Sequence, residues 1–280
     1  MDIMALVGKE DWLFLQNDSN HVIKQTTGEL LLNYRQILYW KTLILLRTLY
    51  FEYKNINYRF IVPPNKESIY HQYHPDEIKF SSTRPVTQII NNLEDKCRSV
   101  VYYSNEFNTT DEFLFPKGET HWCDKFAYFY VFKALKGIAS PLSEELIESY
   151  QKELIWCDLG SKLNPDYKET VTCLRAKNIS SRLTYTNNVV NMGRIDIFEN
   201  ETNKELPKAL VFRDSFFSNI IELFAESFSQ VVYIWHPWID WEVVEKYTPD
   251  IVVNCTIERF LVTLPNDIGG PSWKEIASGK

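Results

Sequence analysis

The chain contains 280 residues with a formal net charge of −7, and 45% of its residues are hydrophobic while 24% are charged. This composition excludes a disordered chain, and because no basic stripe is available to neutralise phosphates, nucleic acid is not expected as a partner. The five cysteines are widely spaced and contain no C-x-x-C pair, so neither a disulfide framework nor a zinc site is indicated.

Predicted strands and helices alternate through the first part of the chain. Residues 8–15 form a turn that leads into a short aromatic strand, and residues 16–28 form a polar loop. A long amphipathic helix is predicted from about Glu29 to Tyr53. Its apolar stripe comprises Leu30, Leu31, Tyr34, Ile37, Leu38, Leu45, Leu49 and Phe51. The next strand, Tyr58–Val62, ends at the sequence PPNK because proline cannot continue a strand ladder.

Two helices and a strand are predicted in the next segment. Residues 81–94 are expected to be helical and Ser99–Tyr103 to form a strand. A polar connection over residues 105–116 leads to the sequence GETHW at Gly118–Trp122. A further helix is predicted over Asp124–Lys136. Its inward residues are expected to be Phe126, Phe129, Tyr130 and Phe132.

The pattern is poorer from residue 141 to about residue 203, where an amphipathic segment at 143–154 is expected together with irregular loops and short strands. Later strands are predicted at 209–212, 230–235 and 249–253, with helices over 216–228 and 241–247. This alternation is typical of a three-layer α/β/α fold with a mainly parallel sheet. We expect one domain over residues 1–280, with a less patterned insertion at about 141–203.

The N-terminal sequence MDIMALVGKEDW lacks the basic and then apolar regions of a signal peptide. The most apolar predicted helix, around residues 37–51, carries Lys41 and Arg47 and is not expected to span a membrane. A soluble, cytoplasmic protein in a reduced compartment is therefore expected. The alternative is a periplasmic or membrane-associated location, which would apply if the sequence has been trimmed.

The stretch from Lys208 to Phe228 contains the first candidate for chemistry. A short apolar strand is followed by the turn Arg213-Asp214-Ser215 and then by apolar residues at helical spacing. A serine at such a turn lies at the carboxyl edge of a sheet, where the first backbone N–H groups of the helix can stabilise a developing oxyanion. The alternative is that Asp214 or Ser215 is only a helix N-cap, which is the commoner use of such a pair.

Glu119-Thr120-His121 is the second candidate. In a loop or at a strand end, residues two apart can direct their side chains into one site. The Glu119 carboxylate could then orient the His121 ring, while the other ring nitrogen accepts a proton from Ser215. An isolated Glu-x-His is more often a surface histidine beside a chance acid, so the prediction depends on the combination of the two motifs.

The motifs GKEDWLFL, PPNK, ETHW, RDSF and PDIVVNCTIERFL occur in this order from Gly8 to Leu261. This ordered set resembles the SGNH-hydrolase-like domain of the alginate O-acetyltransferase family, whose members modify bacterial polysaccharides with a serine, a histidine and an aspartate. The resemblance implies that Ser215 is the nucleophile, His121 the base and Glu119 the orienting acid.

The chain departs from this family in three respects. Glu119 stands where the family usually has aspartate, Arg213 stands where glycine is frequent, and family members are generally exported. The proline-ended strand and the ETH motif precede the serine strand, so the motif order looks circularly permuted relative to ordinary SGNH hydrolases. That alignment places Arg259 near the position of an oxyanion asparagine, as an oxyanion or substrate contact. The alternative, which is at least as common, is a structural ion pair with Glu258 or a neighbour.

The resemblance implies a serine-dependent O-acetyltransferase that acts on a polysaccharide or oligosaccharide and needs an acetyl donor, without a bound cofactor or a metal. A membrane protein on another chain is one candidate source of the acetyl group. We expect Arg213 and Asp214, which lie beside the nucleophile in the sequence, to be substrate-binding or oxyanion residues. Trp122, Trp235 and Trp238 are expected to form a wall that contacts the sugar, with core packing as the alternative. A carbohydrate acetyl-esterase and a catalytically impaired carbohydrate-binding or assembly module of the same fold are the competing functions.

Overall fold

The computed structural model describes residues 4–16, 18–93, 97–103, 114–154 and 156–279. The strands are β1 (Met4–Val7), β2 (Leu13–Gln16), β3 (Asn57–Ile61), β4 (Val100–Val101), β5 (Ile147–Leu154), β6 (Glu169–Ala176), β7 (Ser181–Thr186), β8 (Ile195–Asn200), β9 (Lys208–Arg213), β10 (Gln230–Trp235) and β11 (Ile251–Cys255). The α-helices are α1 (Val22–Thr27), α2 (Tyr34–Tyr53), α3 (Lys66–Ile69), α4 (Pro85–Asn91), α5 (Asp124–Ala134), α6 (Gly160–Leu163), α7 (Ile221–Ala225), α8 (Trp241–Tyr247) and α9 (Trp273–Ser278). Short 3₁₀ helices are η1 (Lys9–Asp11), η2 (His71–Tyr73), η3 (Glu144–Leu146), η4 (Ser215–Ile220) and η5 (Glu258–Val262).

A seven-stranded sheet with the order β4-β3-β11-β9-β10-β8-β7 forms the centre of the molecule. The first five of these strands are parallel, whereas β8 and β7 are added antiparallel at one edge. Strand β9 lies in the middle, between β11 and β10. Because these three strands are parallel, the segments that leave their carboxyl ends meet at the same edge of the sheet, and Ser215 lies in one of them.

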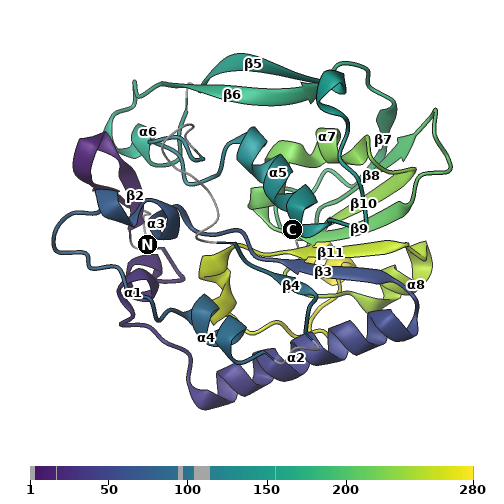
Figure 1. The fold of residues 1–280 in the computed structure, drawn as a ribbon, viewed down its shortest axis with the longest axis horizontal. Coiled ribbons are helices and arrows are strands. Elements are labelled where there is room, and N and C mark those ends of the chain that lie inside the picture. Colours follow the sequence, from purple (N-terminus) through teal and green to yellow (C-terminus); the bar gives the residue numbers. More distant parts are fainter. Residues whose placement is uncertain (1–3, 17, 94–96, 104–113, 155, 280) are drawn as a thin grey trace.

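Helices cover both faces of the sheet, as Figure 1 shows, with α2, α4 and α8 on one face and α5 and α7 on the other. The residues of β9 alternate between the two cores. Leu210 and Phe212 pack on the α2 side, whereas Ala209 and Val211 pack on the α5 side, as the two-residue period of a strand requires. The predicted three-layer α/β/α fold with a mainly parallel sheet is therefore confirmed.

The poorly patterned region contributes to two separate sheets. Its amphipathic segment at 143–154 is not irregular but contains η3 and then β5, which pairs with β6 in an antiparallel hairpin. This hairpin lies over α5 and α7 (Figure 1). Strands β7 and β8 of the same region complete the antiparallel edge of the central sheet.

The buried face of α2 differs from the predicted apolar stripe. Its buried residues are Trp40, Leu43, Ile44, Arg47, Thr48 and Phe51. Tyr34, Leu38 and Leu49 were predicted to be inward but are exposed by 78%, 47% and 47%. Apolar residues occur all around this helix, so periodicity alone did not identify the inner face. The buried face also depends on Arg47, whose guanidinium lies 2.7 Å from the carboxylate of the distant Asp267.

Several predicted boundaries also changed. The predicted loop at 16–28 contains α1, whose Val22 N–H donates to the Asp18 side chain at 2.7 Å. Helix α2 begins only at Tyr34 because Asn33 caps it. The helix predicted at 81–94 is shorter and comprises only α4, because residues 81–84 and 92–93 are not helical. Residue 94 and residues 105–113 of the predicted connection lie outside the described residues. The helix predicted over 216–228 is divided into η4 and α7.

Phe129, which was predicted to face inward from α5, is 39% exposed. Within the part of the chain that the structure describes, no helix combines the length and the apolar character that crossing a membrane requires.

Candidate active site

Ser215, His121 and Glu119 lie together at the carboxyl edge of the central sheet, although 94 residues separate the histidine from the serine. Ser215 Oγ lies 2.9 Å from His121 Nε2. On the opposite side of the ring, His121 Nδ1 lies 2.7 Å from Glu119 Oε1. The imidazole therefore connects a hydroxyl to a carboxylate, which is the arrangement that the motifs predicted.

Asp214 holds the turn that presents Ser215. Its Oδ1 accepts the N–H of Phe216 at 2.8 Å, and its Oδ2 accepts the N–H of Ile257 at 2.7 Å. Burial raises the pKa of this carboxyl. The N-cap alternative thus applies to Asp214 and not to Ser215. Asp214 ties the turn after β9 to the segment after β11, and the Ser215 hydroxyl is directed at His121.

Arg213 is buried and braces the same turn. Its Nη1 donates to the Ser218 hydroxyl at 3.0 Å and to the Asp214 carbonyl at 3.2 Å. Its guanidinium carbon lies 4.4 Å from the centre of the Trp235 ring. Burial lowers the pKa of Arg213 to about 10. The large cation before Asp214 thus braces the turn and leaves Ser215 Oγ within 2.9 Å of His121 Nε2.

A second acid, Asp158, supports the Glu119–His121 pair and was not predicted from the sequence. Its backbone N–H donates to Glu119 Oε2 at 2.9 Å, so both oxygens of Glu119 are engaged. The Asp158 carboxylate accepts the N–H of Thr120 at 2.7 Å and also the Thr120 hydroxyl. Its Oδ2 lies 4.0 Å from His121 Nδ1, so Glu119 and not Asp158 is the direct partner of the ring.

The two carboxyls differ in their electrostatics. Burial by itself would raise the pKa of Glu119, but the hydrogen bond and the charge of His121 hold this pKa below its ordinary value. Burial and the neighbouring charge of Glu119 raise the pKa of Asp158. Glu119 is therefore the carboxyl that favours its ionised form, as an acid that stabilises an imidazolium must.

Glu119, His121 and Asp158 bring potential metal ligands within 4.8 Å of one another. Two carboxylates and an imidazole could hold a divalent cation. In this structure, however, the hydrogen bond to Glu119 already engages His121 Nδ1. The expectation that the site contains no metal stays a prediction.

Lys66 of the PPNK motif fixes the loop that carries Glu119 and His121. The side chain is only 2% exposed. Its Nζ donates to the carbonyls of Pro116, Lys117 and Glu119 at 2.8, 2.6 and 3.1 Å. Burial lowers the pKa of Lys66 to about 8. The PPNK motif thus holds the loop before His121 through hydrogen bonds to backbone carbonyls. The positions of these residues in the sequence could not predict such contacts.

Arg259 lies close to the serine turn but does not form the alternative ion pair with Glu258. Glu258 instead pairs with Arg84 at 3.0 Å. The Arg259 guanidinium lies over the ring of Phe216, 5.2 Å from its centre, and the side chain makes no hydrogen bond or ion pair with any described residue. The pKa of the Asp214 carboxyl is raised overall by burial, and the positive charge of Arg259 partly opposes this rise. A buried cation is therefore available beside Ser215.

The three tryptophans occupy different environments. Trp122 is buried, and its indole N–H donates to the Phe216 carbonyl at 2.6 Å, so it packs beneath the site. Trp235 is partly exposed and lines the cleft described below. Trp238 packs at the edge of the His236 ring, and it does not line that cleft. Of the three residues predicted for the aromatic wall, Trp122 and Trp235 line the cleft and Trp238 does not.

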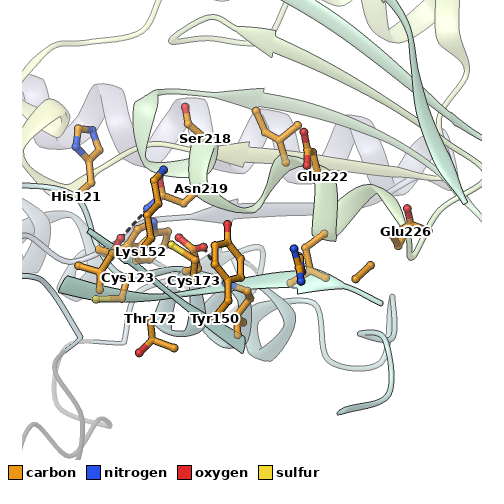
Figure 2. A pocket seen from close by; sticks show the side chains of 18 of the residues that line it. His121, Cys123, Tyr150, Lys152, Thr172, Cys173, Ser218, Asn219, Glu222 and Glu226 are labelled. Atoms are coloured by element: carbon orange, nitrogen blue, oxygen red, sulfur yellow. Dashed lines mark hydrogen bonds between the residues drawn. The ribbon is translucent and has the colours of Figure 1, made fainter. Parts of the chain in front are cut away.

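A cleft of about 960 Å³ extends from His121 and Glu119 beneath the β5–β6 hairpin. Figure 2 shows His121 at one end and Glu222 and Glu226 towards the other, with Tyr150 and Lys152 of the hairpin between them. One wall comes from the hairpin and the other from the segments after β9 and from β8. The volume of the cleft lies near the upper end of the range that small-molecule pockets span.

Comparison with known proteins finds similarity in structure but not in sequence. No protein-family model matches the chain, and no curated protein matches it significantly. The structure of Bacillus cereus PatB1 matches with a TM-score of 0.67 at 14% identity, covering 93% of this chain and 97% of that chain. A second PatB1 structure that also matches contains a sulfonyl adduct.

Two further solved structures match over almost the full length. A DHHW family protein from Eubacterium siraeum has a TM-score of 0.63 at 15% identity, covering 99% of this chain and 97% of that chain. The O-acetyltransferase domain of Pseudomonas putida AlgJ has a TM-score of 0.55 at 13% identity and covers 100% of both chains. The chain has an SGNH-hydrolase-like fold. The resemblance predicted from the ordered motifs is thus confirmed at the level of the fold.

Within this SGNH-like fold, the residues that sequence reasoning missed are Lys66 and Asp158. Lys66 was named only as part of the PPNK motif, although its position two residues after Pro64 could have indicated a fixed backbone. Asp158 lies in the region without a clear pattern. The chain contains 37 acidic residues, and no signal in the sequence distinguishes Asp158 from the others.

Proposed function

We propose that this chain is a serine-dependent O-acetyltransferase that modifies a polysaccharide or oligosaccharide through an acetyl-Ser215 intermediate. The observation that carries the proposal is the continuous hydrogen-bonded chain from Ser215 through His121 to Glu119 at the end of an open cleft. The fold that the chain shares with the AlgJ O-acetyltransferase domain supports the same reaction class.

In the first half-reaction, His121 Nε2 takes the hydroxyl proton of Ser215 while Oγ attacks the acetyl carbonyl of the donor. The tetrahedral intermediate then expels the donor's leaving group, which receives that proton from His121. In the second half-reaction, an acceptor hydroxyl attacks acetyl-Ser215 and gives its proton to His121 Nε2. Ser215 Oγ leaves and takes this proton back, so the enzyme is restored. Glu119 stabilises the imidazolium in both steps. No bound cofactor or metal is required.

The negative charge of each tetrahedral intermediate needs a partner. The backbone N–H of Ser215 donates to no described residue, and the buried Arg259 guanidinium has no ion-pair partner among them. We assign these two groups as the donors to the oxyanion, because a preorganised donor in a site with little water stabilises developing charge strongly.

The acceptor is proposed to lie in the cleft beneath the β5–β6 hairpin. Transfer to a sugar requires the acetyl-enzyme to meet an acceptor hydroxyl before water does. A carbohydrate that fills the cleft next to His121 would place a hydroxyl near Ser215 and exclude water from it. The partly exposed ring of Trp235 offers an apolar surface for a sugar ring.

The test is to supply a small acetyl-ester donor with a panel of oligosaccharides. We expect slow hydrolysis of the donor alone, and faster turnover with a suitable oligosaccharide that itself gains acetyl groups, as measured by mass spectrometry of the sugar. Donor consumption across a broad panel without any acetylated sugar would favour the carbohydrate acetyl-esterase. The absence of donor turnover with retained sugar binding would favour the impaired binding module. A membrane acetyl-donor protein remains the proposed physiological source of the acetyl group.

A separate prediction concerns Lys66, which we expect to position the loop and not to contact the substrate. Lys66→Met should lower turnover roughly 10- to 100-fold, because a small displacement of reacting groups is costly.

Wild-type turnover should also fall as the pH rises through about 8, because burial lowers the pKa of Lys66 to about this value. The neutral amine keeps two N–H groups for three carbonyls, so one carbonyl loses its donor.

The charged groups that act on Lys66 against burial are Glu67, Glu169, Asp158 and Glu119. The measurement is a pH profile of turnover from about 6 to 9, in which Lys66→Met should lack the decline near pH 8. Lys117→Met is the matched control, since Lys117 Nζ donates to the Glu10 carbonyl at the surface and lies over the Trp12 ring but does not hold the carbonyls of the loop before His121. Equal profiles for wild type and Lys66→Met would remove Lys66 from this role.

A further inference from the structure

The outer face of α2 exposes a row of large apolar side chains along the whole helix. Tyr34 is 78% exposed, Leu38 47%, Leu46 55%, Leu49 47% and Tyr53 86%. The helix lies on the outside of one layer, along the bottom of the view in Figure 1. The inner face already packs on the sheet, so the outer face is a second apolar surface on one helix, which is typical of an interaction site.

Two charged residues lie at opposite ends of this row. Arg35 and Glu52 are both exposed, and neither side chain makes a hydrogen bond or an ion pair with any described residue. Other exposed charges on the chain do have partners, as in the Lys54–Glu245 and Arg175–Glu148 pairs. The outer face of α2 therefore offers one unpaired cation at its start and one unpaired anion at its end.

On this face, residues at equal distances from the two ends of α2 either match or carry opposite charges. Tyr34 is the first residue of α2 and Tyr53 the last, while Arg35 is the second and Glu52 the second from the end. Leu38 is fifth from the start and Leu49 fifth from the end. A surface on which each end carries the complement of the other can pair with a copy of itself around a two-fold axis.

We propose that two copies of the chain associate through the outer faces of their α2 helices, packed antiparallel. Leu38 of each copy then lies in the same layer as Leu49 of the other. Each end layer combines Tyr34 and Arg35 of one copy with Glu52 and Tyr53 of the other, so opposite charges meet beside two tyrosine rings. The exposed Thr42 near the centre is small enough for the helices to approach closely.

Other occupants fit the surface less well. A parallel pair would bring Arg35 close to its own copy and Glu52 close to its own copy, so like charges would repel. A membrane surface would favour a basic rim around the apolar row, whereas this row has one cation and one anion on a chain of net charge −7. The α2 face lies across the sheet from the cleft, so pairing leaves both clefts open (Figure 1). The proposal does not depend on the proposed function.

Sedimentation velocity of the purified chain tests this pairing, from about 1 to 200 μM, a range that covers the weak contacts expected of a small interface. We expect a reversible dimer. Leu49→Glu, which changes two positions of the symmetric contact, should raise the dissociation constant at least roughly 30-fold. Leu163→Glu is the matched control, because Leu163 is 50% exposed on α6 and lies outside this face. It should dimerise as the wild type does.

Charge reversal distinguishes the antiparallel pair from any other contact. Arg35→Glu alone and Glu52→Arg alone should each weaken the dimer, because both end layers then hold like charges. The double variant should restore dimerisation. Circular dichroism verifies that each variant is folded. A wild type that stays monomeric at every concentration overturns the proposal, including the case in which it binds phosphatidylcholine and phosphatidylglycerol vesicles instead. A dimer that is unaffected by Leu49→Glu, or not restored by the double charge reversal, overturns it as well.

Discussion

Ser215→Ala is expected to abolish acetyl transfer, with a loss of at least about 10³-fold in turnover and no acetyl-enzyme detectable by intact-protein mass spectrometry. The reason is that Oγ is the atom that would form the covalent bond, and it is the only serine oxygen that the described contacts join to His121 Nε2. The fold should persist, because the turn is held by Asp214 and Arg213 and not by the Ser215 hydroxyl.

Ser218→Ala is the control for this experiment. Ser218 lies three residues further along η4, and its hydroxyl accepts from Arg213, so this variant should keep acetylation within a few-fold of wild type. A sulfonyl fluoride should label wild type and Ser218→Ala but not Ser215→Ala. Sugar acetylation that continues in folded Ser215→Ala would exclude the covalent mechanism.

Glu119→Gln should reduce turnover by about 10² to 10⁴-fold while the protein stays folded. A neutral amide cannot stabilise the imidazolium, and a comparable change in a serine protease triad has an effect at the upper end of this range. The amide can still accept hydrogen bonds from His121 Nδ1 and from the Asp158 N–H, so the loop is expected to keep its conformation. Initial rates with the small acetyl-ester donor measure the effect.

Asp158→Asn is the matched comparison for Glu119→Gln, because both changes remove one charge beside His121. Asp158 lies 4.0 Å from Nδ1 and mainly holds Thr120, so we expect only a roughly 3- to 30-fold loss. If Asp158→Asn lost more activity than Glu119→Gln, the orienting acid would be Asp158. Unchanged turnover in both variants would show that His121 acts without either acid.

The fold and the central site contacts could be predicted because they depend on local signals. Strands β9, β10 and β11 are short apolar runs bounded by prolines or polar turns, and such runs are readable without tertiary information. The strand-turn-helix signal placed Ser215 at the sheet edge, and the Glu-x-His spacing brought Glu119 to the His121 ring.

The parts that could not be predicted depend on contacts between distant segments. The inner face of α2 is fixed by the buried pair Arg47–Asp267, whose members are 220 residues apart. The strand β5 alternates only weakly because most of its residues are exposed, and it is β6 that contacts α5 and α7. Lys66 reaches the loop before His121 through backbone carbonyls, which carry no sequence signature.

The β5–β6 hairpin and its connection contribute both to the shape of the cleft and to the position of Glu119, so an evolving enzyme cannot change these two properties separately. Strands β5 and β6 supply one wall of the cleft, and the connection between them, which contains α6, carries Asp158, whose N–H holds Glu119. An insertion or exchange in this hairpin would alter the shape offered to a sugar and would also shift the support of the proposed acid. New acceptors are therefore most accessible through side-chain changes on the hairpin strands, such as at Tyr150 or Lys152, with residues 156–160 kept unchanged.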